Sequence, residues 1–451
     1  MTGTVILVTV LSALMALSIV NRRWLILAIL LGGGFPFGLF MPHERFFGLY
    51  ANGAYLFVIL SAIIISFFFV IPDLFSQTLK YSGVFFFLLY CLFSLLWTSD
   101  IEWGVRTLVK LVSPFIFFVA AQAFLKREQD LRIASRMIFA CCLIVSLLAV
   151  VNTLGNGVLA PGEDLYNVRH NYLAAPYMSP ANYSFLIGSG AILAFTNLLT
   201  TRKLSYLFLS ILFTILVFWS FVRISMAGLV AAIGIVFFLL TRNFAVKLVF
   251  PVMIFVIFVT CIFTVEKFRS RMFKSDKFGI ETVLSTEVNK LDNIIYTSGR
   301  STLWRKAYVE FLQKRPLTGG GIGSVDSWLE KYFNSVRLHS EYLRIASDLG
   351  VLGLILFLLS ICQFYARLLA LYLSNNNPVV RSYTVTALAG LTFYLITFAT
   401  DNSLNYICEF GLYIYSFMAF AFISAREGEE ISAHVCEETL PCANLTPSAL
   451  K

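Results

Sequence analysis

Hydrophobic residues fill long stretches of the chain, and short polar segments separate these stretches. A helix needs about 20 mostly apolar residues to cross the hydrocarbon core of a bilayer. Thirteen apolar runs approach this length, near residues 3–20, 24–40, 51–71, 82–97, 108–125, 133–153, 181–199, 204–221, 225–240, 246–264, 350–373, 383–400 and 406–424. The pattern therefore predicts an all-α polytopic membrane protein with about 12–13 transmembrane helices.

The composition agrees with a membrane protein and argues against a soluble one. Of the 451 residues, 59% are hydrophobic and 13% are charged, whereas soluble domains carry about 25% charged residues. Arg22 and Arg23 follow the first apolar run rather than precede it, so we expect a retained span and not a cleaved signal peptide. Basic residues that anchor cytoplasmic loops explain the net charge of +9, and we expect no nucleic-acid partner.

The distribution of Lys and Arg predicts the sidedness of the loops. Alternate loops carry basic residues with little acid, which places them in the cytoplasm: 21–23, 126–132, 201–203, 241–245 and 374–382. Two of the remaining, extracytoplasmic loops are long, 154–180 and 265–349, and long loops are usually functional. The second has 14 Lys and Arg against 10 Asp and Glu, a net charge of +4. Either an anionic ligand or solvated helix faces would explain this excess.

The long loop divides the chain into four parts. These are an N-terminal membrane bundle, an extracytoplasmic helical loop, C-terminal membrane helices and a polar cytoplasmic tail, at 1–264, 265–349, 350–424 and 425–451. Apolar spacing and capping residues predict three helices in the loop: in "SGRSTLWRKAYVEFLQKRP", in "SVDSWLEKYF" and from about Leu338 onward. We expect the tail to be poorly ordered.

Several kinds of chemistry lack the residues that they require. "GGGIGS" at 319–324 is rich in glycine but has no Lys followed by Ser or Thr, so it is not a nucleotide-phosphate loop. The chain has no Asp-x-Asp pair, which argues against a divalent metal that holds a nucleotide sugar. The eight cysteines form no recognisable disulfide framework, and the spacing of His434, Cys436 and Cys442 matches no standard zinc pattern. We expect no metal and no cofactor.

Arginines and one histidine on the extracytoplasmic side are the main candidates for a site. Arg223 interrupts an apolar stretch in "FWSFVRISMAGL", as either a snorkelling group or an anion ligand that faces a cavity. Arg300 lies in the first turn of the predicted loop helix, where free backbone N–H groups favour anions. An unperturbed imidazole has a pKa near 6.5, so His339 can accept a proton at neutral pH, although most lone histidines are structural or exposed.

Weaker candidates lie in the other extracytoplasmic segments. They are Arg169 and His170 in "RHNY", Asp100 with Glu102, and Asp401 with Asn402. Each carboxylate could orient an acceptor hydroxyl, and each could equally be an ordinary interfacial residue.

Three segments, taken in order, resemble the O-antigen ligase and polymerase superfamily of bacterial envelope glycosyltransferases. They are "SFVRISMAGL", then "SGRSTLWRKAYVEFLQKRPLTGGGIGS" in the long loop, then "LHSEYLRIASDLGVLGL" leading into a span. The resemblance is most specific over about 295–355. The family usually has His-Asn where this chain has His339-Ser340.

The resemblance implies a GT-C-like enzyme of the bacterial inner membrane, surrounded by membrane lipids, with its active site on the periplasmic side. The donor would be a glycan on undecaprenyl diphosphate, and the acceptor a sugar hydroxyl of lipid A–core oligosaccharide, without metal or nucleotide. Arg223 and Arg300 would hold the diphosphate, and His339 would act as the base that activates the acceptor. Further substrate-binding residues would be Arg337, Arg169 and Asp401. Arginine forks suit phosphate oxygens, which agrees with these roles.

Three other functions remain open at this point, one of them a related ligase that glycosylates proteins. An O-antigen or exopolysaccharide polymerase would use the same donor, with a second lipid-linked glycan as acceptor. A transporter of lipid-linked sugars would show two related halves with discontinuous helices, and no such symmetry is visible. A one-sided loop of 85 residues with its own helices favours an enzyme.

Overall fold

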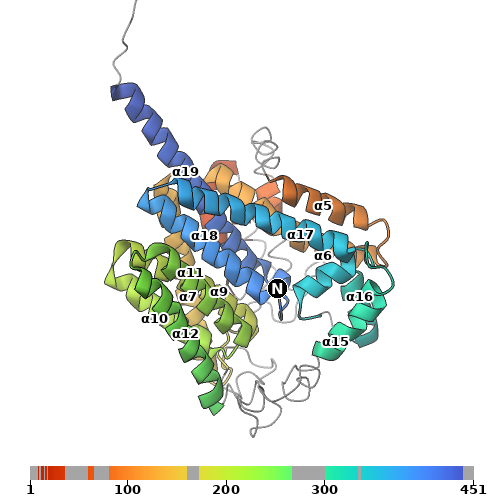
Figure 1. Cartoon of the computed structure of the whole chain (residues 1–451). Coiled ribbons are helices and arrows are strands. Elements are labelled where there is room, and N and C mark those ends of the chain that lie inside the picture. The colour runs from red at the N-terminus through yellow and green to blue at the C-terminus, as the bar shows by residue number, and fades with distance from the viewer. Residues whose placement is uncertain are drawn as a thin grey trace, which may run out of the picture.

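The protein is a bundle of helices (Figure 1). The computed structural model describes residues 9, 12–14, 16–17, 19–35, 59–64, 81–159, 172–266, 300–333 and 337–439. Every regular element in these residues is a helix, which confirms the expected fold class. The elements are α2 (Arg22–Gly32), α5 (Ser82–Ser94), α6 (Ile101–Phe124), α7 (Glu128–Leu154), α9 (Pro180–Thr201), α10 (Leu204–Trp219), α11 (Arg223–Leu240), α12 (Phe244–Thr264), α15 (Arg300–Ala307), η3 (Tyr308–Leu312), α16 (Ser324–Phe333), α17 (Glu341–Ser374), α18 (Pro378–Thr397), η4 (Ser403–Asn405), η5 (Ile407–Gly411) and α19 (Leu412–Thr439).

Seven helices in the described part of the chain are long and apolar enough to cross a membrane. They are α6, α7, α9, α11, α17, α18 and Ile407–Gly428, which joins η5 to α19. Two further apolar helices, α5 and α10, are shorter. The chain is therefore a multi-pass membrane protein. The runs expected at 3–20, 24–40 and 51–71 lie partly or wholly outside the described residues, so the number of spans stays a prediction.

Helix α18 lies inside the bundle, where it packs against α9, α11, α17 and α19. The ring of Phe393 on α18 lies over glycines of two neighbours, Gly188 of α9 and Gly228 of α11. A Cβ atom at either glycine would come within 2.6 Å of this ring. Small residues thus let α9 and α11 approach α18 closely, as is usual where membrane helices pack.

Helices α11 and α18 run in opposite directions. Near one end, Gly228 packs against Phe393. At the other end, the Tyr372 hydroxyl donates to the Leu239 carbonyl (2.6 Å) and accepts from the Arg381 guanidinium (2.7 Å). The first residue of α11 therefore lies at the same end of the bundle as the C-terminus of α18, where the connection to α19 begins.

Helix α17 bends at Gly350, which has φ +71°. The bend falls at the expected boundary between the loop helix and the span. Here the chain at 316–323 lies directly against the α17 backbone. The Gly321 N–H donates to the Asp348 carbonyl (2.8 Å), and the Val351 N–H donates to the Pro316 carbonyl (2.8 Å). Only glycine fits such a close approach at a positive φ.

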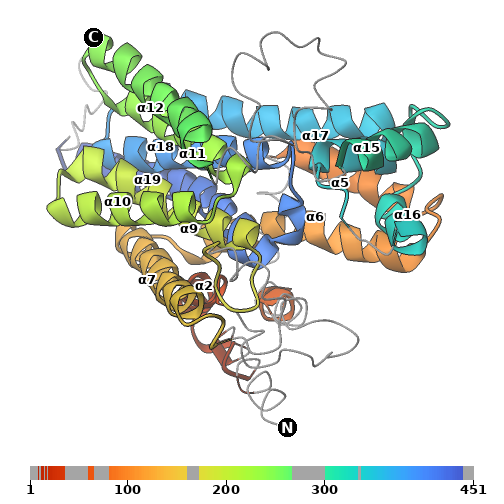
Figure 2. The same ribbon diagram turned by 90° about the horizontal axis from the view of Figure 1, so that it is seen from below.

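The three predicted loop helices are present, and the third is the part of α17 before Gly350, which begins at Glu341 rather than near Leu338. Helix α16 spans the predicted "SVDSWLEKYF". The first helix begins at Arg300 as α15 and widens into the π-helix η3 before Pro316. Figures 1 and 2 show α15 and α16 together at one edge of the molecule, beside the ends of α6 and α17. Their shared small core contains Ala307, Val325, Leu329 and Leu338.

The prediction for the tail was wrong in part. Helix α19 continues to Thr439, well past the expected end of the last span at 424, and Figure 1 shows it extending beyond the other helices. The segment "AREGEEISAHVCEET" is polar, but Ala, Arg and Glu have high helix propensity. Polarity ends the membrane span there without ending the helix.

We expect Gly350→Ala to destabilise the fold. A Cβ at this position would lie 2.1 Å from the Leu317 carbonyl oxygen. The loss in unfolding free energy should therefore exceed the roughly 1–3 kcal/mol that a positive φ costs a residue other than glycine. Thermal unfolding in detergent, followed by circular dichroism, measures this. Gly428→Ala is the matched control, because the nearest atom to its Cβ would be 4.0 Å away. Equal stability of both variants would contradict the prediction.

Candidate functional site

The connection between α18 and η5 meets the segment just before α17. Asn402, which is 2% exposed, makes two contacts with His339. Its Oδ1 accepts from the His339 backbone N–H (2.8 Å), and its Nδ2 lies 3.0 Å from the His339 Nδ1. Because both contacts go to one residue, they fix the backbone and the ring of His339 together.

Further contacts join the same two segments. The Glu341 N–H donates to the Phe398 carbonyl (2.8 Å), and the Glu341 carboxylate accepts from the Leu404 N–H (2.9 Å). Ser340 caps α17 by accepting from the Leu343 N–H. Serine is among the residues favoured at this position, so its side chain stabilises the first turn of α17.

Helix α15 brings a guanidinium to this junction. Arg300 donates from Nη1 to the Thr400 carbonyl (2.5 Å). One turn later, Trp304 donates from its indole N–H to the Leu338 carbonyl (2.7 Å). One face of α15 therefore contacts both the connection that follows α18 and the segment that contains His339. The structure thus brings Arg300 and His339 together, although 39 positions separate them in the sequence.

The environment of His339 makes its imidazole a weak proton acceptor. Burial, together with the charges of Arg300 and Arg337, lowers the pKa of His339 to about 4. The ring is therefore neutral at pH 7, but its pKa lies well below the ordinary value from which the base role was argued. His339 also has φ +60°, a conformation that is uncommon for residues other than glycine. Such strain persists only where the surroundings enforce it, and it is frequent at functional sites.

Asp401 points into the protein. It is 5% exposed, and its Oδ1 accepts from the Asn402 N–H (2.7 Å) and from the Tyr406 hydroxyl (3.2 Å). Burial raises the pKa of Asp401, and the Asn402 N–H, Arg300, Tyr406 and Arg337 oppose that rise. Its carboxylate thus orients the residue that holds His339. A direct contact between Asp401 and substrate stays a prediction.

The remaining predicted site residues differ in what the structure says of them. Arg337 is exposed, two residues before His339. Arg223 is half-buried and begins α11 at the same end of the bundle as Thr397 and the Asn402 connection. Arg169 and His170 lie outside the described residues. Four of the six predicted residues thus gather around one junction, and Arg223 lies at its level in the bundle.

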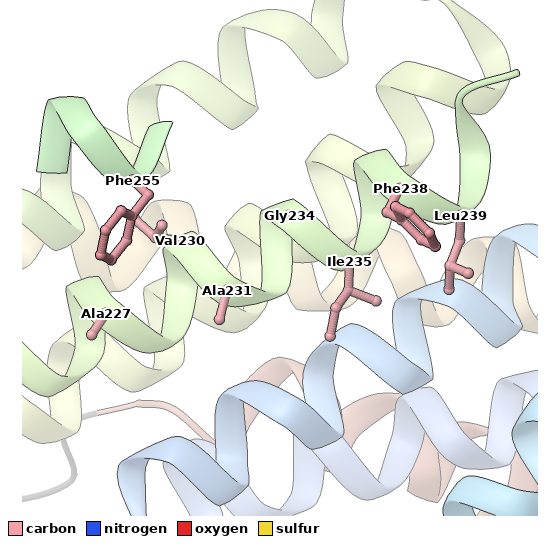
Figure 3. A pocket seen from close by; sticks show the side chains of 8 residues that line it. All are labelled: Ala227, Val230, Ala231, Gly234, Ile235, Phe238, Leu239 and Phe255. Carbon is pink, nitrogen blue, oxygen red and sulfur yellow. The ribbon is translucent and has the colours of Figure 1, made fainter. Parts of the chain in front are cut away.

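A groove on α11 extends away from Arg223 toward the other end of the bundle. Its volume is about 560 Å³, and it is lined by Ala227, Val230, Ala231, Gly234, Ile235, Phe238, Leu239 and Phe255 (Figure 3). Ala227 and Ala231 follow Arg223 by four and eight residues, so they lie on nearly the same face of the helix. The groove is thus an apolar extension of the surface that carries this arginine.

Two sequence features have structural roles. Asp100 caps α6 by accepting from the Glu102 and Trp103 N–H groups (3.0 and 3.2 Å). The N–H groups of the glycine-rich segment are occupied as well, because the Asp348 carboxylate accepts from Gly323 and Val325 (3.0 and 2.8 Å). The segment therefore binds a carboxylate of its own chain, which agrees with the absence of a phosphate-loop pattern.

A buried ionic group escaped sequence reasoning. Arg344 lies 2.9 Å (Nε) from Glu341 Oε2 and 3.5 Å (Nη1) from Asp326 Oδ2, and all three side chains are at most 2% exposed. The spacing of Glu341 and Arg344 in "HSEYLRIASD" looks like an ordinary exposed helix face, and Asp326 lies in a different helix. The signal that could have revealed them is the excess of charge directly before an apolar span. Since the Glu341 carboxylate also accepts from the Leu404 N–H, this ionic group helps to fix the connection that contains Asn402.

The family model described as O-antigen ligase matches residues 208–358. This range runs from α10 into α17 and includes Arg223, Arg300 and His339. The match confirms the resemblance drawn from the sequence for this part of the chain. No curated protein matches the chain.

We expect Arg300→Gln to raise the pKa of His339 from about 4 toward 6.5, because removal of a positive charge favours the protonated imidazole. NMR titration of labelled histidine measures this shift, and His339→Gln protein identifies the signal among the four histidines. Arg242→Gln is the control, since Arg242 is exposed beyond the opposite end of α11. An unchanged pKa in Arg300→Gln would show that this guanidinium does not act on the ring.

Proposed function

We propose that this chain, whose residues 208–358 belong to the O-antigen ligase family, moves a glycan from undecaprenyl diphosphate to a sugar hydroxyl. The proposed acceptor is lipid A–core oligosaccharide, at the periplasmic face of the bacterial inner membrane. The proposed catalytic residues are His339, Arg223 and Arg300, with substrate-binding contributions from Arg337, Arg169 and Asp401.

The convergence of Arg300, Arg337 and His339 is the observation that carries this proposal. Both guanidinium groups act electrostatically on the imidazole, and all three come from the loop between α12 and α17 or its end. Two guanidinium groups beside a half-buried ring favour a ligand with negative charge. A lipid diphosphate has this charge.

The groove on α11 supports a donor that carries a lipid. Arg223 lies at the level of the junction, and the apolar lining continues from it along the helix (Figure 3). A donor with its diphosphate near Arg223 would place its polyprenyl chain along Ala227 and Ala231. The small side chains of this lining leave room for a hydrocarbon chain. Burial of that chain against the apolar lining is favourable, because it removes apolar surface from water.

The residues of the site suit a transfer that needs little covalent help. Lipid diphosphate is already a good leaving group, so the protein must mainly position the reactants and stabilise the developing negative charge. When the bond between the anomeric carbon and the phosphate oxygen breaks, its electron pair goes to that oxygen. Guanidinium groups can bind diphosphate oxygens in pairs, which stabilises this charge.

The acceptor decides between the first proposal and its nearest alternative. A ligase uses lipid A–core oligosaccharide, whereas a polymerase uses a second lipid-linked glycan. Purified protein in vesicles, supplied with lipid-linked glycan and with each acceptor in turn, separates the two. Movement of the donor across the bilayer without any transfer product would instead indicate a transporter.

We expect His339→Ala and Arg300→Ala to lower the transfer rate in this assay by at least about 100-fold, the usual loss when a group that stabilises transition-state charge is removed. Lys314→Gln should retain the rate, because among the described residues this exposed loop cation pairs only with Glu310. The amount of folded protein is measured alongside. Transfer should also persist in EDTA. Full activity of His339→Ala, or a loss in EDTA that Mg²⁺ restores, would contradict the proposal.

We expect Ala231→Phe to weaken donor binding by filling the groove. The apparent KM for lipid-linked donor should rise about tenfold, equal to about 1.4 kcal/mol, while kcat changes little. Ile215→Phe, on a lipid-facing surface of α10, provides the control. A water-soluble donor with a short lipid should show no difference between the two variants. An unchanged KM for the full-length donor would exclude the groove as its binding site.

A further inference from the structure

The orientation of the Asn402 amide is determined by its neighbours. A backbone N–H can only donate, so the Asn402 atom that lies 2.8 Å from the His339 nitrogen must be the carbonyl oxygen. A flipped amide would place two donors against each other there. The NH₂ group therefore faces the imidazole, 3.0 Å from Nδ1.

The orientation of the amide in turn selects the tautomer of His339. An NH₂ group can only donate, so Nδ1 must present its lone pair to Asn402. A neutral imidazole carries one proton, which then resides on Nε2. Among the described residues, the structure gives Nε2 no hydrogen-bond partner. The free nitrogen of this ring is therefore a donor.

This arrangement conflicts with the base role that the family resemblance implies. A base at Nε2 needs its lone pair on that atom and its proton on Nδ1, where the proton would face the amide hydrogens of Asn402. A base at Nδ1 would have to displace Asn402 from a buried position. Neither change is compatible with the contacts that hold the segment.

We propose that His339 acts as a neutral hydrogen-bond donor through Nε2–H toward the diphosphate of the donor substrate, and that Asn402 is the positioning residue that sets this tautomer. This inference rests on the proposed function and refines the mechanism of the same site. A neutral imidazole that polarises an oxygen in this way is a known catalytic device.

The proton balance of the transfer closes without a protein base. The anomeric carbon exchanges its bond to the phosphate oxygen for a bond to the acceptor oxygen. The electron pair of the broken bond stays on the diphosphate, which takes up the proton that the acceptor hydroxyl loses. His339 keeps its own proton throughout and stabilises the departing oxygen.

The charges around the ring are consistent with this role. Arg300 faces it from α15, Arg337 precedes it on its own segment, and Asp401 lies behind Asn402 in the opposite connection. Two cations beside the ring oppose a third positive charge on the imidazole, so a neutral donor can lie next to them. An anionic ligand would be held by all three groups.

Asn402→Asp separates donor from base by the sign of the pH dependence. A carboxylate in this position would accept from the backbone N–H and draw the ring proton to Nδ1, which would raise the pKa of His339. The Nε2–H would then persist only in the imidazolium. If His339 is a donor, the transfer rate of Asn402→Asp falls as pH rises through the new pKa of the ring. If it is a base, the rate rises over the same range, which overturns the proposal.

His339→Gln and His339→Ala provide a second comparison that does not depend on Asn402→Asp folding. Both share the strained backbone position, so their ratio isolates the side chain. Gln retains an N–H donor but has no titratable base. A donor role predicts that Gln keeps at least tenfold more activity than Ala. Equal loss in both variants contradicts the proposal.

The tautomer itself can be measured without substrate. The ¹⁵N signals of labelled histidine in the wild-type protein should show Nε2 protonated and Nδ1 bare at pH 7. The opposite pattern would overturn the inference even if the enzyme transfers glycan. A wild-type protein with the expected tautomer but no transfer would instead refute the proposed function, so the two failures are distinguishable.

Discussion

The paired contact between the Asn402 amide and His339 is the constraint on which the site depends. It joins a connection near the end of the membrane bundle to the last residues of the long loop, 63 positions earlier in the chain. Arg300 and Glu341 hold the same connection from two other elements, through Thr400 and Leu404. Three of these contacts reach a backbone group, so the connection between α18 and η5 positions the groups that the loop supplies.

A buried ionic group attaches the loop helix α16 to α17. Arg344, Glu341 and Asp326 have left water almost completely, at a cost of several kcal/mol per ion if unpaired. Asp326 belongs to α16, whereas the other two belong to α17, so a shift of α16 would separate the charges. Asp348 adds to this by accepting from two N–H groups of the glycine-rich turn before α16. The ion group therefore specifies one position of the loop helices and, through Glu341, of the segment with His339.

Local sequence patterns predicted the helices of this fold, whereas contacts between residues far apart in the sequence determine the geometry of the site. The boundaries of α16, and the break at Gly350 between a loop helix and a span, follow from apolar spacing and a single glycine. The alternation of basic loops predicted that Arg223, Arg300 and His339 lie on one side of the membrane, and this sidedness stays a prediction. The tail was misjudged because helix propensity was not weighed against its polarity. No local pattern links Asn402 to His339, since the two meet only after α17 and α18 have folded back on each other. The tautomer was inaccessible for the same reason.

Binding of an anionic ligand changes the electrostatics of the ring but not its hydrogen-bonding capacity. In the free protein, burial and the two arginines depress the pKa of His339 to about 4. A diphosphate would compensate these cations and so favour proton uptake by the imidazole. A base would lose its function through that change, because a protonated ring cannot accept. A donor keeps its function, since Nε2 carries a hydrogen in the neutral ring and in the imidazolium alike. The site therefore tolerates the very perturbation that its own substrate would cause.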